Sequence, residues 1–391
     1  MTTRIVVVPG PGLDGARCSE WGKEIGVDVD VRPGDPAAVV GAMATGHPSM
    51  AADSGNGCPP TPAGVVIAPG PDGFDVSGLA RAVAAAAAPV VAVEPGNLRK
   101  AGLQPECTRI VAAGARVLYG RGPDTARHAL LHLAFRHGQP VDTLAYGPDP
   151  SQEGDLWCPA GAGPHPVAVL FHGGFWYHAW ERDHIDGLAR DLAHRGIAVW
   201  NGEYRRVGAG GGWPATGEDA ARATDHLVPL APVYGLDLDR VAVVGHSAGA
   251  QLALWVAARG RRGEVHPVLA VGLATIADLE AAMNERVGGG SIARFLGAGA
   301  GIGGDGDTEV AMVDASPRAH LPIGVPQLLA HAIQDDVVPL SQTTDYAAAA
   351  DTAGDDVTVV EFPAGGHFDL IDPATTAWAA VAAEMQTRLS G

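Results

Sequence analysis

Short β-branched runs alternate with longer Ala- and Leu-rich segments along most of this 391-residue sequence. In the first third, apolar runs at 5–8, 27–31, 65–68, 90–93 and 116–119 are separated by loops and by helical segments at 76–88 and 126–136. The alternation starts again at 167–171 and continues to a last run at 357–361. Strands that alternate with helices form parallel sheets covered on both faces. We therefore expect an α/β fold built on parallel sheets.

The alternation is interrupted once, at His137-Gly-Gln-Pro140, and a polar stretch at 146–164 follows. The chain is too long for one ordinary core and comfortable for two domains. We place the boundary near 138–145 and predict domains at 1–139 and 140–391. The second of these has the usual size of a single α/β domain. Within it, the Gly-rich interval 287–306 has no clear period, and we expect either a mobile lid or an irregular excursion there.

The charge balance and the cysteines exclude several classes of protein. Lys and Arg number 26 against 44 Asp and Glu, a formal net charge of -18. Nucleic acids and anionic membranes bind basic patches, so neither is expected as a partner. The four cysteines form no C-x-x-C pair and no metal-ligand spacing, so we expect no metal, no cofactor and no disulfide framework. The apolar run at 5–8 is too short for a signal peptide or membrane span, which favours a cytoplasmic protein.

The sequence Gly245-His-Ser247-Ala-Gly249 is the most specific motif in the chain. It follows the apolar run 241–244 and precedes a helical segment at 250–259, which is the context of a strained strand-to-helix turn that presents a serine nucleophile. The two glycines keep the strand and helix backbones close together. Ser247 would then lie at a helix N-terminus, where the dipole favours developing negative charge. We predict that Ser247 is a nucleophile.

A serine nucleophile needs a base within hydrogen-bond reach, and in chain order an acid and then a histidine should follow it. Downstream of Ser247 the candidate histidines are His320, His331 and His367. His331 lies inside an apolar run and is more typical of a packed residue. His320 looks like a loop or surface residue. His367 lies in a flexible loop just after the last strand, so we predict it to be the base.

The acid is expected in Asp335-Asp336-Val-Val-Pro339, after the apolar run 327–331. A carboxylate at the carboxyl end of a parallel strand faces the same edge of the sheet as the turn at Ser247. Either aspartate is placed to serve. The D-x-x-V-P spacing favours Asp335, and the other reading of Asp336 is a solvated loop carboxylate.

Backbone N–H groups that stabilise an oxyanion are predicted at Gly173, Gly174 and Phe175, together with Ala248 after the nucleophile. The loop follows the apolar run 167–171, and its glycines allow close approach of the backbone. We interpret His172 as a residue that shapes this loop.

Four aromatic residues and two arginines are expected near the entrance of the site, and each can be interpreted in two ways. Trp176, Tyr177, Tyr204 and Trp213 either line an acyl or aromatic pocket or serve as ordinary packing. Arg205-Arg206 either meets a substrate carboxylate or is tied to nearby acidic residues.

With these motifs in place, residues 141–391 resemble the α/β-hydrolase superfamily, in its branch of esterases, lipases and kynurenine formamidases. The matching features are Tyr146-Gly147 with Asp155-Leu156, His172-Gly-Gly-Phe-Trp176, Glu203-Tyr-Arg205, the motif at 245–249, Asp335, and His367-Phe-Asp-Leu-Ile371. The resemblance implies an eight-stranded, mostly parallel sheet and acyl-enzyme chemistry. An aromatic residue and Trp after His-Gly-Gly are typical of the formamidases of this branch, whereas its lipases more often have a third glycine.

The first domain matches G-x-G-x-x-G weakly, at Gly10-Pro-Gly12-Leu-Asp-Gly15, but the segment 16–26 that follows is a poor helix with Gly22 inside it. Residues 4–136 instead resemble type II 3-dehydroquinate dehydratase, a flavodoxin-like fold, through segments at 5–13, 64–70, 89–97 and 115–122. Trp21 stands where that family has its catalytic Tyr, and Ala68 where it has Asn. Glu94 takes the place of its catalytic His. With the phenol and imidazole gone, we expect no dehydratase activity. The family commonly forms trimers and larger assemblies, so the resemblance is consistent with a homo-oligomer.

The sequence thus favours a serine hydrolase that cleaves a small carboxylic ester or amide through an acyl-enzyme on Ser247. Three alternatives stay open. The same residues would serve an aryl formamidase, or an acyltransferase or cyclase acting on a biosynthetic intermediate. The third alternative, of a different class, is a ligand-binding scaffold that acts through the first domain.

Overall fold

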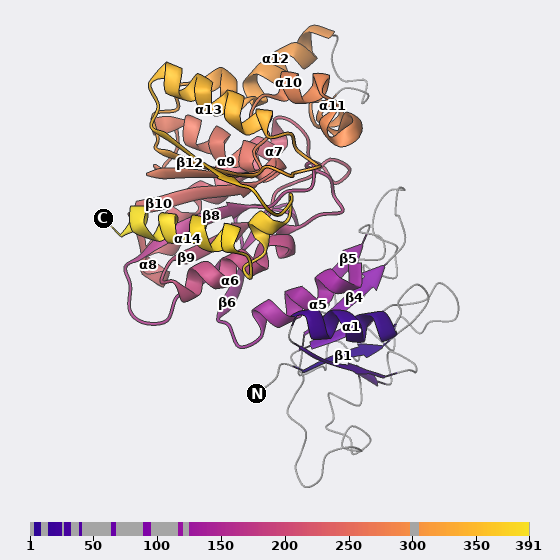
Figure 1. Cartoon of the computed structure of the whole chain (residues 1–391). Coiled ribbons are helices and arrows are strands. Elements are labelled where there is room, and N and C mark those ends of the chain that lie inside the picture. Colours follow the sequence, from indigo (N-terminus) through magenta and orange to yellow (C-terminus); the bar gives the residue numbers. More distant parts are fainter. Residues whose placement is uncertain are drawn as a thin grey trace. The chain divides into compact units, whose positions relative to one another are not determined.

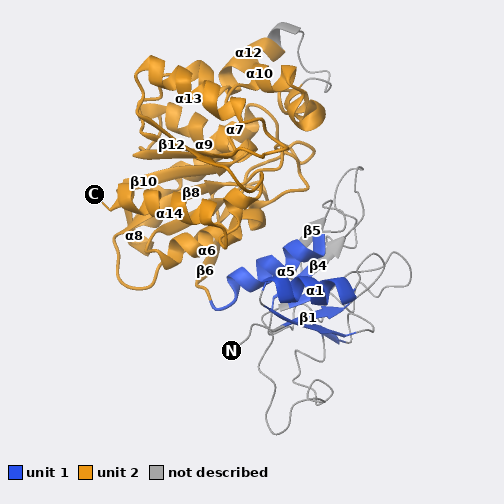
Figure 2. Cartoon of the chain, in the orientation of Figure 1, with its two compact units in different colours: residues 1–138 blue, residues 139–391 orange. Residues whose placement is uncertain are grey.

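The computed structural model describes residues 4–8, 15–25, 27–32, 39–40, 64–67, 89–94, 116–119, 125–297 and 305–390. Backbone contacts divide the chain into two compact units, Met1–Gly138 and Gln139–Gly391 (Figure 2). The helix expected at 76–88, the loop expected at 44–63 and most of the G-x-G-x-x-G sequence lie outside the described residues.

The first unit contains a five-stranded parallel sheet in the order β2-β1-β3-β4-β5. Its strands are β1 (Arg4–Val8), β2 (Asp28–Val31), β3 (Gly64–Ile67), β4 (Val90–Glu94) and β5 (Arg116–Tyr119). This strand order is that of the flavodoxin-like fold, as expected. Side chains of β1, β3 and β4 form a core with the helices α1 (Gly15–Ile25) and α5 (Thr125–Arg136).

The expectation of a poor helix at 16–26 was wrong, because α1 runs through Gly22. A Cβ at Gly22 would overlap the side chain of Val29 on β2. The glycine that weakens the helix locally is therefore the residue that lets β2 pack against it.

The second unit contains an eight-stranded sheet in the order β13-β12-β11-β10-β8-β9-β7-β6 (Figure 1). The strands are β6 (Val141–Ala145), β7 (Glu153–Trp157), β8 (His165–Phe171), β9 (Ala198–Gly202), β10 (Leu236–His246), β11 (Leu269–Leu273), β12 (Gln327–Ala332) and β13 (Val357–Phe362). All pairings are parallel except those of β7 with β6 and β9. The expected eight-stranded, mostly parallel sheet and the α/β fold class are confirmed.

Strands β6 and β7 were not anticipated. They fall in the expected boundary and in the polar stretch after it, where composition indicated a loop. β6 lies at the sheet edge, and Asp142 and Thr143 on it are exposed. An edge strand tolerates such polar residues because one of its sides faces solvent.

Helices cover both faces of this sheet: α6 (Asp186–His194) and α14 (Thr376–Leu389) lie on one face, and α7 (Ala215–Asp225) and α9 (Ala248–Ala258) on the other (Figure 1). A second helix, α8 (Leu227–Tyr234), follows α7 after a break at His226. Pro229 has no N–H to bond the carbonyl of Asp225, so one continuous helix cannot run through this point. The remaining helices are α10 (Leu279–Asn284), α11 (Ser291–Phe295), α12 (Asp305–Ala315) and α13 (Ser341–Ala353).

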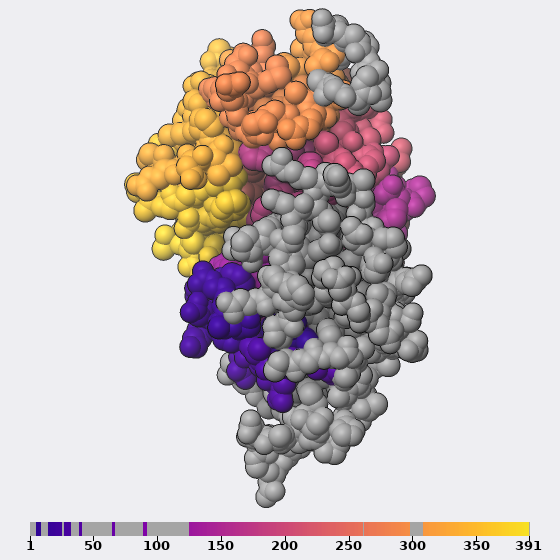
Figure 3. Space-filling model, turned by 90° about the vertical axis from the view of Figure 1, so that its right-hand side faces the viewer, coloured from indigo at the N-terminus to yellow at the C-terminus, as the bar shows by residue number. Residues whose placement is uncertain are grey.

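The Gly-rich interval 287–306 is more regular than expected. It contains a 3-10 turn at Val287–Gly290 and the whole of α11, while residues 298–304 lie outside the described part. The helices around it form the orange surface at one end of the second unit (Figure 3). No helix among the described residues is long and apolar enough to span a membrane.

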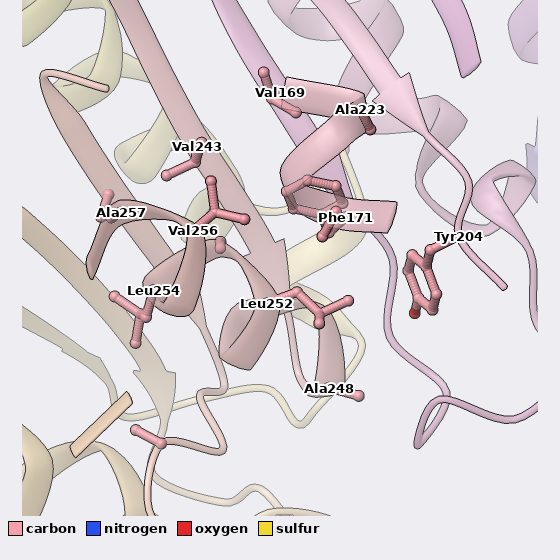
Figure 4. Packing of buried hydrophobic residues seen from close by; sticks show 14 of the residues in the cluster. Val169, Phe171, Tyr204, Ala223, Val243, Ala248, Leu252, Leu254, Val256 and Ala257 are labelled. Carbon is pink, nitrogen blue, oxygen red and sulfur yellow. The ribbon is translucent and has the colours of Figure 1, made fainter. Parts of the chain in front are cut away.

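The core of the second unit lies between the central strands and α9. Val256 and Leu252 on α9 face Val243 on β10 and Phe171 on β8 (Figure 4), and all four are at most 1% exposed. Burying an aliphatic side chain of this size stabilises the fold by about 1.5–3 kcal/mol. This packing fixes the position of the first turn of α9 relative to the end of β8, where the candidate site lies.

Candidate active site

Ser247 lies between the end of β10 and the start of α9, in a strained backbone conformation. Its φ of 55° and ψ of -120° fall where residues with a side chain rarely occur. Its N–H donates to the carbonyl of Leu273 at 2.8 Å, and its carbonyl accepts from the N–H of Ala250 at 2.9 Å. Strain of this kind costs about 1–3 kcal/mol and clusters at functional sites. The predicted strand–turn–helix context of Ser247 is present.

The glycines of the motif allow three backbone segments to meet. A Cβ at Gly245 would overlap the carbonyl oxygen of Gly249, and a Cβ at Gly249 would overlap that of Phe171. A Cβ at Gly173 would lie 3.1 Å from the Cβ of Ser247. The loop that follows β8 is therefore held directly against the serine.

His367 and Asp335 form a close pair at the carboxyl ends of β13 and β12. His367 Nδ1 lies 2.7 Å from Asp335 Oδ2, and both side chains are at most 3% exposed. The other carboxylate oxygen, Oδ1, accepts from the N–H groups of Val337 and Val338, each at 2.8 Å. Since a carboxylate accepts, the proton of neutral His367 lies on Nδ1 and leaves Nε2 free to act as a base.

Burial raises the pKa of Asp335, but hydrogen bonds from His331 and His367 and the charge on His367 outweigh it. The pKa is held well below its ordinary value. Asp335 is therefore ionised and can stabilise an imidazolium at His367. Asp336 is exposed, and His320 Nε2 lies 2.7 Å from the carbonyl of Asp314, away from the pair.

His246, the residue before Ser247, connects the serine turn to His367. Its Nε2 lies 3.0 Å from the carbonyl oxygen of His367, and the two rings are 4.5 Å apart. Burial and the neighbouring charge of His367 lower the pKa of His246 well below its ordinary value. His246 is therefore neutral, with its proton on Nε2 facing the carbonyl. Sequence reasoning assigned no role to this residue.

The loop after β8 carries consecutive residues with positive φ. Gly174 has a φ of 107°, Phe175 of 53° and Trp176 of 55°, and the N–H of Tyr177 donates to the carbonyl of Gly174 at 3.0 Å. Two adjacent residues with side chains in this region are uncommon. Gly173, Gly174 and Phe175 of this loop, together with Ala248, are the residues predicted to stabilise an oxyanion, and the structure places the loop beside Ser247 through Gly173.

A network of buried polar side chains supports the loop that follows β8. His172 Nε2 lies 2.8 Å from Glu203 Oε1, and the Tyr204 hydroxyl donates to the His172 carbonyl at 2.8 Å. Burial raises the pKa of Glu203, but Arg206, His172 and Arg182 outweigh it and hold the pKa below its ordinary value. These contacts are those of a residue that shapes the loop, as interpreted for His172.

The arginine pair is tied to acidic residues. Arg205 Nε lies 2.7 Å from Asp219 Oδ2, and Arg206 Nη1 lies 3.3 Å from Glu181. Both guanidinium groups have protein carboxylates as partners, which favours the structural reading over capture of a substrate carboxylate.

Two of the four predicted pocket aromatics are core residues. Trp176 and Tyr204 are fully buried, and the Trp176 ring stacks on Phe295 at 4.2 Å. These contacts favour the packing reading for the two residues. Tyr177 and Trp213 are partly exposed and keep both readings.

The sequence analysis did not single out Phe368, an exposed aromatic residue beside His367. Phe368 is 51% exposed, and its ring lies 5.1 Å from His367 and 5.8 Å from His184. The sequence signal was its position directly after the predicted base.

Comparisons with known proteins agree with this geometry. Residues 155–349 match the BD-FAE family model. Among curated proteins, the chain is 32% identical over 128 residues to a probable isoprenylcysteine alpha-carbonyl methylesterase of Oryza sativa subsp. japonica, a match that covers 32% of this chain and 29% of the relative. It is 34% identical over 122 residues to esterase LipI of Mycobacterium tuberculosis, over 31% of this chain and 35% of the relative. The chain thus spans about a third of the length of these relatives.

Solved structures with the same fold include a bacterial heroin esterase, with a TM-score of 0.55 and 24% identity over 67% of this chain and 88% of that chain. Esterase B of Lactobacillus rhamnosis gives a TM-score of 0.57 and 21% identity over 68% and 91%. None of these matches tests the resemblance of the first unit to dehydroquinate dehydratase. Residues 139–391 thus have an α/β-hydrolase fold, and residues 155–349 are similar in sequence to the BD-FAE family.

Proposed function

We propose that the second unit is a serine hydrolase that cleaves small carboxylic esters through an acyl-enzyme on Ser247. The observation that carries the proposal is the buried His367–Asp335 pair at 2.7 Å, which His246 connects to the strained turn at Ser247. The similarity to proteins named esterases supports an ester as the substrate.

In this mechanism Ser247 Oγ attacks the acyl carbon, and His367 Nε2 takes the hydroxyl proton. The negative charge that forms on the carbonyl oxygen is stabilised by backbone N–H groups of the loop 173–175 and of Ala248. Asp335 holds the imidazole and stabilises its charged form. His367 then gives the proton to the leaving alcohol, and a water molecule releases the acid by the same steps in reverse.

A small ester is favoured over an aryl formamide because the matched relatives are named esterases. The aromatic pair Phe175-Trp176 was the reason to consider a formamidase. Trp176 is used to hold the loop, so its presence does not by itself specify an aromatic substrate.

The test is hydrolysis of p-nitrophenyl esters of increasing acyl length and of N-formylkynurenine by the wild type and Ser247→Ala. We expect ester turnover in the wild type and a fall in kcat of at least about 10⁴-fold in the variant, as for nucleophile loss in other serine hydrolases. The matched control is Ser390→Ala, which removes an exposed hydroxyl at the end of α14. Equal turnover in both variants would refute the proposal. Faster turnover of the formamide than of any ester would replace the substrate class.

For residues 1–139 we propose a flavodoxin-like unit that resembles type II dehydroquinate dehydratase and lacks its chemistry. Trp21, which stands where that family has its Tyr, lies within α1 and is 5% exposed. Arg17 lies over the Trp21 ring at 5.2 Å and pairs with Glu20 at 2.9 Å. An indole has no hydroxyl to ionise, so Trp21 cannot supply the proton transfer that a tyrosine would supply at this position.

A further inference from the structure

A second buried histidine contacts the carboxylate of the candidate triad. His331 lies in β12 and is fully buried, four residues before Asp335. Its Nε2 lies 3.0 Å from the carbonyl oxygen of Val338 and 3.4 Å from Asp335 Oδ2. Both of these oxygens are acceptors, so Nε2 must carry the proton. A lone pair on Nε2 would face two oxygen atoms without a hydrogen between them.

The other ring nitrogen of His331 is paired with a hydroxyl. Thr343 lies in the first turn of α13 and is fully buried, and its Oγ1 is 2.7 Å from His331 Nδ1. Because Nδ1 carries no proton when Nε2 does, the Thr343 hydroxyl is the donor in this bond. The carbonyl of Val338 and the carboxylate of Asp335 thus select the tautomer of His331, and the Thr343 hydroxyl, which can donate or accept, donates to Nδ1 and holds the ring in place.

The four contacts of Asp335 fix its orientation. Oδ1 accepts from two backbone N–H groups, and Oδ2 accepts from His367 at 2.7 Å and from His331 at 3.4 Å. A carboxylate with donors on both oxygens cannot rotate without losing some of them. His331 acts on the oxygen that also receives His367, so any change at His331 affects the hydrogen bond on which the base depends.

We propose that Thr343 and His331 are positioning residues that extend the candidate triad: the Thr343 hydroxyl fixes the ring of His331 through Nδ1, and His331 holds Asp335 Oδ2 toward His367. The inference rests on the proposed function, since it assigns the two residues a role in the reaction of Ser247. Neither residue touches the substrate. A chain of contacts thus runs from Thr343 on α13 through His331 and Asp335 to His367, the proposed base.

The alternative is that His331 only fills space in the sheet. A matched pair of variants separates the two readings. Thr343→Val keeps the shape of the side chain and removes its hydroxyl, whereas Thr343→Ser keeps the hydroxyl and removes a methyl group. If packing is what matters, serine is the more damaging change. If the hydroxyl donor is what matters, valine is the more damaging change.

The experiment measures kcat and KM for the best p-nitrophenyl ester, together with the melting temperature. We expect Thr343→Val to lower kcat about 5- to 30-fold, the effect of losing one buried hydrogen bond, with KM changed less than about twofold. Thr343→Ser should stay within about threefold of the wild type. His331→Gln, whose amide can still donate toward Asp335, should retain more kcat than His331→Phe. Loss of the valine variant's activity with rescue by serine supports the proposal. Equal kcat in valine and wild type, or a larger loss in serine than in valine, overturns it.

A spectroscopic measurement decides the tautomer without any substrate. In protein labelled with ¹⁵N-histidine, two-bond ¹H–¹⁵N correlations distinguish an imidazole protonated at Nε2 from one protonated at Nδ1, and the signal absent in His331→Gln is assigned to His331. We expect the Nε2–H form in the wild type and in both Thr343 variants, because the oxygens of Val338 and Asp335 select it, and a shift of the Nδ1 resonance only in Thr343→Val, where the donor to Nδ1 is lost. An Nδ1–H form in the wild type would overturn the proposal even if the protein is an active esterase. If Ser247→Ala hydrolyses esters as well as the wild type, the proposed function fails instead, and the spectrum still reports on His331.

Discussion

The Asp335→Asn variant gives the sharpest test of how the candidate triad is held, because the structure leaves the amide no good orientation. If the amide NH₂ replaces Oδ2, it faces His367 Nδ1, a donor 2.7 Å away. His367 must then move its proton to Nε2, the nitrogen proposed to act as the base, which can then no longer accept one. If the NH₂ replaces Oδ1, it faces the N–H groups of Val337 and Val338, each a donor at 2.8 Å.

The size of the effect follows from these two orientations. The second orientation loses two hydrogen bonds to a charged acceptor, about 1.5–3 kcal/mol each, or roughly 3–6 kcal/mol in all. The first orientation retains those two hydrogen bonds, but His367 can then no longer act as a base. Either way the competent state is rare, and we expect kcat to fall about 10³- to 10⁴-fold, equivalent to about 4–5.5 kcal/mol in the barrier.

The assay is steady-state hydrolysis of the best p-nitrophenyl ester, with thermal unfolding measured on the same preparations. Asp336→Asn is the matched control, since it makes the same change in the adjacent, exposed carboxylate. We expect its kcat to stay within about twofold of the wild type, as for an exposed surface substitution. If Asp335→Asn keeps more than about a tenth of the wild-type kcat while Asp336→Asn does not, the acid has been assigned to the wrong residue and the reasoning from the two orientations fails.

Two further predictions concern the network behind the loop and the first unit. Glu203→Gln should destabilise the protein at pH 7 by about 1–3 kcal/mol, because it removes a charged acceptor from buried His172 and Arg206, although Arg206 keeps Glu181 as a partner. The pKa of Glu203 is depressed in the folded state, so its contribution is present above about pH 4.3 and is lost as the pH falls further. Urea unfolding at pH 7 and pH 3.5 should therefore show a gap between variant and wild type that narrows at the lower pH. Exposed Glu384→Gln is the control, and a gap that widens with acid would contradict the assignment. For the first unit, the full-length protein with 3-dehydroquinate should produce no enone absorbance above that of buffer; a rise that scales with protein concentration would show that dehydratase chemistry has been kept.

Much of the candidate site could be predicted from the sequence because its residues follow strand ends. Ser247 comes directly after β10, and Asp335 and His367 lie in the loops that follow β12 and β13. The carboxyl ends of parallel strands meet at one edge of a sheet. A local pattern of apolar run, small residues and helix is enough to place such a residue. The paired contact of His367 with Asp335 then follows from the neighbouring positions of β12 and β13.

Contacts that depend on how a helix lies on the sheet could not be predicted in this way. His331 was interpreted as packed, and nothing in its local sequence indicated that it reaches Asp335 or meets Thr343. That contact depends on the rotation of α13 about its axis, which is set by tertiary packing. The edge strand β6 was missed for a related reason, since its polar residues are explained only by its place in the sheet.

The fate of Trp176 shows why closeness in sequence to a catalytic loop is a weak guide to substrate contact. Phe175 and Trp176 both hold positive φ values, at about 1–3 kcal/mol each, and such a loop persists only if its surroundings fix it. Trp176 supplies part of that fixation, because its ring stacks on Phe295 and its Nε1–H donates to Gln251 Oε1 at 3.0 Å. Gln251 lies on α9, four residues after Ser247, and its own amide donates to the carbonyl of Ala315. The tryptophan thus ties the predicted oxyanion loop to the helix that carries the nucleophile. This structural role explains the burial of Trp176 without any contact to a substrate.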